Sequence, residues 1–148
     1  IGIVRALLPP EHEWQDVLGK IQRELMVVMS HVATPSAIRD KNPNSLSDDL
    51  VSFCEQQIDV LTGQMQDNGF FILPGGTLIS AHLQLARTVA RRAERRLWTL
   101  YRKDPLPEEI MQFVNRLSDL LFTMARYEMF RQDHAEERWN SFLYKRKR

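Results

Sequence analysis

The sequence predicts an all-α protein that folds as an up-and-down five-helix bundle, in which the first helix is short. Apolar residues recur at alternating steps of three and four along most of the chain, which is the period of an amphipathic helix. Prolines and glycines interrupt this pattern at a few places and divide it into segments of helical length. No stretch alternates between apolar and polar residues as a strand does, so nothing favours a sheet.

Length and composition limit the class of protein. The 148 residues suffice for a single domain, 1–148, with one packed core. A content of 43% hydrophobic and 26% charged residues is typical of a globular protein, and no apolar run reaches the roughly 20 residues that cross a membrane. The net charge is only +1, so any anion site must be local. Cys54 is the single cysteine, which fits a cytoplasmic location.

The first two helices are separated by a pair of prolines. Residues 1–8 are expected to be the last turns of a helix, because nothing before Ile1 could cap it, and Pro9-Pro10 ends it. The second helix is expected from Glu11 to Val32. Its apolar stripe is formed by Trp14, Leu18, Ile21, Leu25, Val28 and Val32. The polar stretch 36–44 then predicts a surface loop.

The third helix is expected to begin at Ser45, which has Asp48 three residues later as in a capping box, and to end at Gly69. Its expected core contacts are Leu50, Phe53, Ile58 and Leu61. Residues 70–73 are too short for a helix and have no evident strand partner, so an apolar connector is predicted, followed by the turn 74–76.

The last two helices are the longest. A fourth helix is expected from Leu78 to about Lys103, and prolines and first-turn acids in residues 104–109 predict the start of a fifth. This fifth helix should run at least to Phe130 and at most to Trp139. The core face of the fourth helix is expected to carry Ile79, Leu83, Ala86, Ala90, Ala93, Leu97 and Leu100.

A second, polar row borders that apolar face of the fourth helix. It contains Arg87, Arg91, Glu94, Trp98 and Tyr101, with Arg95 beside it. Guanidinium groups four residues apart at the edge of a core can form a fork for phosphate oxygens, with Glu94 orienting them. Ordinary ion pairs on a helix surface explain the same spacing equally well.

A polar notch interrupts the apolar ridge of the fifth helix at Asn115, Ser118 and Asp119. These residues share a face at i, i+3 and i+4. Buried polar groups need partners, so the notch indicates either hydrogen bonds to a facing helix, such as Asp119 with an arginine, or contact with a ligand.

Three segments together resemble a known family. They are Phe71-Ile72-Leu73-Pro74-Gly75-Gly76, then the arginine-rich run 86–96, then Asn115-Arg116-Leu117-Ser118-Asp119-Leu120-Leu121-Phe122. In this order and spacing they are similar to the ATP:cob(I)alamin adenosyltransferases of the trimeric, propanediol-utilisation type. The resemblance covers most of the chain and weakens in residues 36–47 and beyond Arg131.

The resemblance implies a homotrimer that moves the 5′-deoxyadenosyl group of ATP onto the cobalt of cob(I)alamin and releases triphosphate. ATP, Mg²⁺ and cobalamin are the implied ligands, with ATP and the corrinoid bound between subunits. The residues that contact ATP would be Arg91, Arg92, Glu94, Arg95 and Asn115. Phe71 would lie beneath the corrin and displace its lower axial ligand, with Asn115 in the same cobalamin pocket. Arg87 would brace the subunit interface, and Phe71 and Arg91 would be the catalytic residues.

The family opens with a segment that this chain does not contain. That segment, roughly Thr-Lys-x-Gly-Asp-x-Gly, wraps the triphosphate, and we expect it to be a loop that orders only when ATP binds, the alternative being an impaired enzyme. The acid that pairs with Arg87 in the family is also absent from this chain. A corrinoid reductase and a B12-dependent enzyme are the protein partners that the resemblance suggests.

Two other classes remain open from the residues alone. The first is a non-catalytic helical bundle that binds nucleic acid or a protein partner through the face from Arg87 to Lys103, with binding that weakens as salt rises. The second is a purely structural oligomer. If the adenosyltransferase prediction holds, neither nucleic acid nor a membrane is a partner.

The scattered histidines, His12, His31, His82 and His134, are expected to be structural or exposed.

Overall fold

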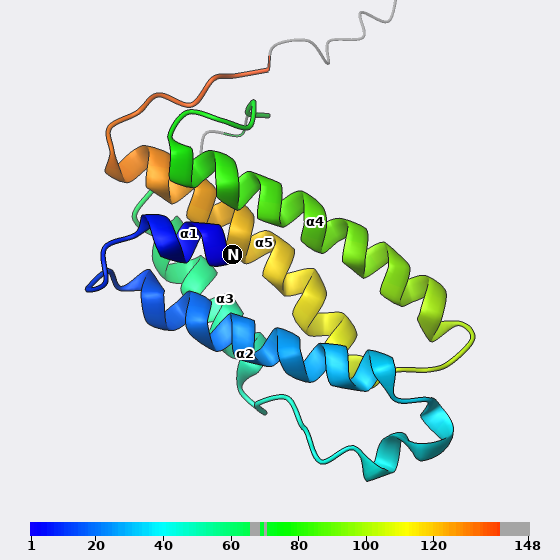
Figure 1. Ribbon diagram of the computed structural model, residues 1–148. Helices are drawn as coiled ribbons and strands as arrows, with labels where there is room; N and C mark the ends of the chain where they lie inside the picture. The colour runs from blue at the N-terminus through cyan, green and yellow to red at the C-terminus, as the bar shows by residue number, and fades with distance from the viewer. Residues whose placement is uncertain (66–68, 70, 140–148) are drawn as a thin grey trace, which may run out of the picture.

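The structure, a computed structural model, describes residues 1–65, 69 and 71–139 (Figure 1). Its elements in chain order are α1 (Gly2–Leu7), α2 (Trp14–Ala33), the 3-10 helix η1 (Ser36–Lys41), α3 (Leu50–Thr62), α4 (Leu78–Tyr101) and α5 (Glu108–Arg131). The expected all-α bundle of five helices is confirmed. In the described part of the chain no helix is long and apolar enough to span a membrane.

Helix α5 is the centre of the bundle. It packs against α4 on one side and α3 on the other, and α1 contacts both α2 and α4 (Figure 1). Buried side chains occur on almost every side of α5, including Phe113, Leu120 and Met124 with no exposed surface. Such burial all round is typical of a helix enclosed by others rather than of an amphipathic surface helix. The polar groups that α5 does expose are therefore few and fixed in direction.

Local capping explains where α4 begins. The Thr77 hydroxyl accepts a hydrogen bond from the Ser80 amide at 3.1 Å, which satisfies one of the free N–H groups of the first turn. Helix α5 follows Pro107 and has Glu108 and Glu109 in its first turn, where acidic side chains stabilise the helix through its dipole. Both starts agree with the sequence-based expectations.

Helix α3 is shorter than expected at both ends. The expected cap Ser45 does not begin a helix, and Ser47, two residues later, donates from its amide and its hydroxyl to the carboxylate of Glu24, a side chain buried in α2. The helix therefore begins only at Leu50, and it ends at Thr62 with Gly63 as C-cap rather than at Gly69. Leu50 and Leu61 are buried as expected, and Cys54 is buried too.

The expected surface loop 36–44 holds a buried arginine. Arg39 in η1 donates to the carbonyl oxygens of Thr34 at 2.7 Å and of Pro105, and its guanidinium pairs with Asp104 at 2.9 Å. Hydrogen bonds from Ser36, together with Arg39, lower the pKa of Asp104. A buried cation needs such partners. The contacts of Arg39 with Asp104 and Pro105 connect η1 to the loop between α4 and α5.

The connector before α4 has a strand partner that the sequence did not reveal. Ile72 forms an antiparallel bridge with Arg138. The Leu73 amide donates to the Glu137 carbonyl at 2.8 Å, and the Trp139 amide donates to the Phe71 carbonyl at 2.8 Å. Helix α5 ends at Arg131 because the chain turns at Asp133, whose φ is +50°, and returns along the connector (Figure 1).

Candidate functional site

Glu94 and Asn115 meet between α4 and α5. The Asn115 side-chain amide donates to Glu94 Oε1 at 2.9 Å. The Glu94 side chain is only 12% exposed, so this carboxylate is held in place at the edge of the core. Two residues that the resemblance assigns to one ligand, 21 positions apart in the sequence, are therefore direct neighbours.

Three arginines of α4, Arg91, Arg92 and Arg95, are exposed to solvent, and Arg91 lies beside this carboxylate. Arg91 Nη1 lies 4.0 Å from Glu94 Oε2, and its side chain is 50% exposed. Arg92 and Arg95 are exposed, and within the described part of the chain neither makes an ion pair. The expected position at the edge of the core holds for Glu94, but Arg91 and Arg95 reach further into solvent. This face of α4 therefore presents guanidinium groups that an anion with several oxygens could bind.

Arg87 occupies the next position along the same row and is half-buried. Its Nε donates to Gln84 Oε1 at 2.9 Å, and its guanidinium carbon lies 5.4 Å from the centre of the Phe122 ring. Arg126 lies 6.0 Å from the same ring centre. Among the described residues no carboxylate pairs with Arg87, and the Phe122 ring contacts two cations.

The polar notch of α5 does not form a single network facing α4. Ser118 is buried and donates to the Asn115 carbonyl of its own helix at 2.9 Å. Asp119 pairs at 3.1 Å with Arg116, also in α5, and Arg116 lies 3.2 Å from Glu55 of α3. Of the two alternatives for the notch, the pairing of Asp119 with an arginine of the facing helix is not observed, because Arg116, three residues away on α5, is its partner.

Phe71 is not a core residue. It is 69% exposed, and its carbonyl is bonded to Trp139. The far end of the connector is fixed at Gly76, where φ is +86° and an added Cβ would lie 2.1 Å from the end of the Met129 side chain. Only glycine fits there without rearrangement. The connector therefore presents an exposed aromatic ring on a main chain that is held at both ends.

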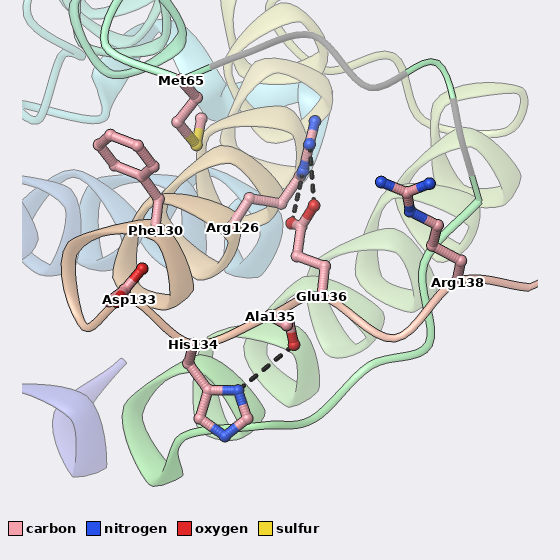
Figure 2. Close-up of a pocket in the computed structure, with 8 residues that line it drawn as sticks. All are labelled: Met65, Arg126, Phe130, Asp133, His134, Ala135, Glu136 and Arg138. Atoms are coloured by element: carbon pink, nitrogen blue, oxygen red, sulfur yellow. Dashed lines mark hydrogen bonds and ion pairs between the residues drawn. The ribbon is translucent and has the colours of Figure 1, made fainter.

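Three surface features were not expected from the sequence. A hollow of about 510 Å³ lies between the end of α5 and the segment that follows, and Arg126 and Glu136 point toward each other beside it (Figure 2). A hollow of about 370 Å³ lies beside His31 and Pro107. An apolar groove of about 930 Å³ runs between α1, α2 and α4, lined in part by Met26, Val89 and Ala93. Ala93, expected in the core, is exposed in this groove.

The described residues offer no site built to hold a metal ion. Across residues 1–65, 69 and 71–139 no group of three or more His, Cys, Asp or Glu side chains is arranged to bind one. His31 is buried with Nε2 2.8 Å from the Asn44 carbonyl, which is a structural role.

The fold is a helical bundle in which exposed guanidinium groups of α4 lie near a carboxylate held by an amide of α5. Residues 1–128 match the family model described as cobalamin adenosyltransferase. The chain therefore belongs to the cobalamin adenosyltransferase family.

Individual relatives agree with this assignment. The chain is 34% identical over 129 residues to the corrinoid adenosyltransferase of Bacillus subtilis, covering 85% of this chain and 65% of that protein. It is 38% identical over 129 residues to the corrinoid adenosyltransferase MMAB of Homo sapiens, covering 85% and 52%. It thus spans between half and two thirds of these two relatives.

Solved structures show the same fold. A variant of the PduO-type ATP:corrinoid adenosyltransferase from Lactobacillus reuteri, complexed with cobalamin and ATP, superposes with a TM-score of 0.84 at 29% identity, covering 95% of this chain and 76% of that chain. A second variant of that enzyme, complexed with ATP, also gives a TM-score of 0.84 at 29% identity, covering 94% and 78%.

Proposed function

We propose that this chain is the helical bundle of a corrinoid adenosyltransferase, which transfers the 5′-deoxyadenosyl group of ATP to the cobalt of cob(I)alamin and releases triphosphate. The observation that carries the proposal is the Glu94–Asn115 contact at the base of the exposed arginines. It supports a site where Arg91, Arg92 and Arg95 contact the phosphates. The solved relatives complexed with ATP and cobalamin have the same fold, which adds further support.

The reaction asks for charge neutralisation and alignment rather than proton transfer. Cobalt(I) attacks C5′, the cobalt–carbon bond forms as the C5′–oxygen bond breaks, and triphosphate leaves with the electron pair. Arg91, Arg92 and Arg95 would stabilise the charge that develops on the leaving group, and Glu94, held by Asn115, would orient Arg91. No proton is removed from a substrate, so no general base is required.

Phe71 is proposed to act on the other substrate. An exposed aromatic ring on a fixed connector can lie beneath a corrin ring and exclude both the lower axial ligand and water. Cobalt(II) without that ligand is easier to reduce to cobalt(I), because the ligand donates electron density to the metal. This role differs from that of a core phenylalanine, for which 69% exposure would be unusual.

The assembly is proposed to be a homotrimer in which ATP and the corrinoid bind between adjacent subunits, with Arg87 bracing the interface. The absence of a carboxylate partner for Arg87 among the described residues is consistent with one supplied by another subunit. A cytoplasmic location, and contacts with a corrinoid reductase and a B12-dependent enzyme, belong to the same proposal.

The test is adenosyl transfer by the complete gene product, followed by the absorbance change as the cobalt–carbon bond forms from chemically reduced corrinoid. We expect transfer that requires ATP and falls strongly in Arg91→Ala. The competing function, nucleic-acid or partner binding through the face from Arg87 to Lys103, predicts ATP-independent binding that weakens steeply with salt. That result without any transfer would replace the proposal.

A further inference from the structure

We propose that Arg126 and Glu136 form a positioning pair that pins the segment after α5 against that helix and thereby fixes the main chain of Phe71. This inference rests on the role proposed above for Phe71. Neither residue belongs to the segments that suggested the family, and Glu136 lies where the resemblance weakens.

The geometry of the pair is that of a strong, partly desolvated ion pair. Arg126 Nε donates to Glu136 Oε1 at 2.8 Å, and Nη2 donates to Oε2 at 3.0 Å. The two side chains are only 19% and 15% exposed. Figure 2 shows the two parallel bonds from the guanidinium to the carboxylate. A planar fork against a carboxylate fixes orientation as well as distance.

The rest of the segment has little burial to hold it. Of the described residues that follow α5, Glu136 is half-buried, whereas 132–135 and 137–139 are exposed. The start of the segment is tied to the end of α5 by main-chain bonds, such as that from the His134 amide to the Met129 carbonyl at 2.9 Å. Further along, the Arg126–Glu136 pair joins the segment to the side of α5.

The anchored segment is the one that pairs with the Phe71 connector. Directly after Glu136, the Glu137 carbonyl accepts from the Leu73 amide, and the Trp139 amide donates to the Phe71 carbonyl, both at 2.8 Å. If the ion pair is lost, these two hydrogen bonds lose the support that fixes their register. The exposed ring of Phe71 would then sample more positions.

The same pair is linked to the arginine row of α4. Arg126 and Arg87 both contact the Phe122 ring, with guanidinium-to-centroid distances of 6.0 and 5.4 Å. Arg126 therefore stands between the residue proposed to brace the subunit interface and the connector that carries Phe71. A displaced Arg126 would affect both the contacts of Arg87 with the Phe122 ring and the position of the connector, so the test needs a readout specific to the connector.

The first measurement is amide hydrogen exchange at Leu73 and Trp139. Glu136→Gln keeps the shape of the side chain and removes its charge, and we expect exchange at both amides to accelerate at least about tenfold. Glu137→Gln is the matched control, because its exposed side chain lies next in the sequence while only its main chain bonds Leu73. The Leu120 amide in the buried part of α5 should not change in either variant.

A double-mutant cycle shows whether the two residues act together. Arg126→Met and Glu136→Gln should each accelerate exchange, and the double variant should exchange no faster than the more affected single one. Additive effects would show that the residues act separately, and unchanged exchange at Leu73 and Trp139 would show that the pair does not hold the connector. Either result overturns the proposal.

The second measurement follows the four-coordinate cobalt(II) signal of the complete gene product with cob(II)alamin and ATP. Glu136→Gln should reduce this signal at least about fivefold at saturating corrinoid while ATP affinity stays the same, and Glu137→Gln should match the wild type. Faster exchange with an unchanged signal would overturn the positioning role. If the wild type gives no such signal, the role proposed for Phe71 fails, and the exchange data alone decide whether the pair fixes the connector.

Discussion

Replacing Arg91 with lysine tests the arginine row while keeping its charge. Arg91 lies 4.0 Å from Glu94, and the Asn115 amide of the neighbouring helix holds that carboxylate in place beside the guanidinium. Lysine keeps the positive charge but cannot donate two parallel bonds to phosphate oxygens. The variant therefore removes the fork and little else.

The size of the effect follows from the position of the side chain. A hydrogen bond to a charged group is worth about 1.5 to 3 kcal/mol, and more where charge develops in a transition state. The Arg91 side chain is 50% exposed in the isolated chain, so we take the lower end of that range. A loss of ~1.4 kcal/mol corresponds to about a tenfold fall in the rate of adenosyl transfer, and we expect at least that.

Arg96→Lys is the matched control in the same transfer assay. Arg96 is also an exposed arginine of α4, but it lines the apolar groove and is not among the proposed phosphate contacts. It should retain wild-type rates, and both variants should unfold at the wild-type midpoint, since lysine is an equally good helix former. Wild-type rates in both Arg91→Lys and Arg91→Ala would refute the catalytic role of this face.

Four further results are expected. Phe71→Ala should leave ATP affinity nearly unchanged and abolish most of the four-coordinate cobalt(II) signal; loss of several kcal/mol of stability instead would show a packing role. Light scattering after size exclusion should show a trimer, and a monomer at micromolar concentration would count against shared sites. Deleting the residues after Arg138 removes the Trp139 amide that bonds Phe71 and should weaken corrinoid binding; unchanged affinity would exclude a role for the tail, whose Phe142 and Tyr144 lie outside the described residues. Burial raises the pKa of the Cys54 thiol to about 11. The unfolded thiol ionises near pH 8.5, so the free energy of unfolding should fall as the pH rises from about 8.5 toward 11. Urea unfolding of Cys54→Ala should not show this fall.

Local patterns predicted the helices because the spacing of apolar residues depends only on nearby positions. The stripe of Trp14, Leu18, Ile21 and Val28 is buried as its period indicates. The errors arise where a distant residue decides the structure. Ser45 does not begin α3 as expected, because Ser47 beside it bonds to Glu24 of α2, and Arg39 is buried against Asp104, 65 positions away. No pattern in the neighbouring sequence predicts either contact.

The candidate site shows the same division. The contact between Glu94 and Asn115 agrees with the family resemblance, which places both on one ligand. The direction of Asp119 could not be read from its spacing alone, since Arg116 on the same helix offers a closer partner. The pairing of Ile72 with Arg138 joins segments more than 60 residues apart, and neither segment has the alternation of apolar and polar residues that would predict a strand.

In the proposed reaction ATP is cleaved at C5′ and its three phosphates leave together. Phosphorus NMR of the reaction of the complete gene product with ATP and reduced corrinoid measures this directly. We expect one equivalent of inorganic triphosphate for each adenosylated corrinoid, with no ADP formed in step. Release of ADP and phosphate, or unchanged ATP beside an unmodified corrinoid, would contradict it.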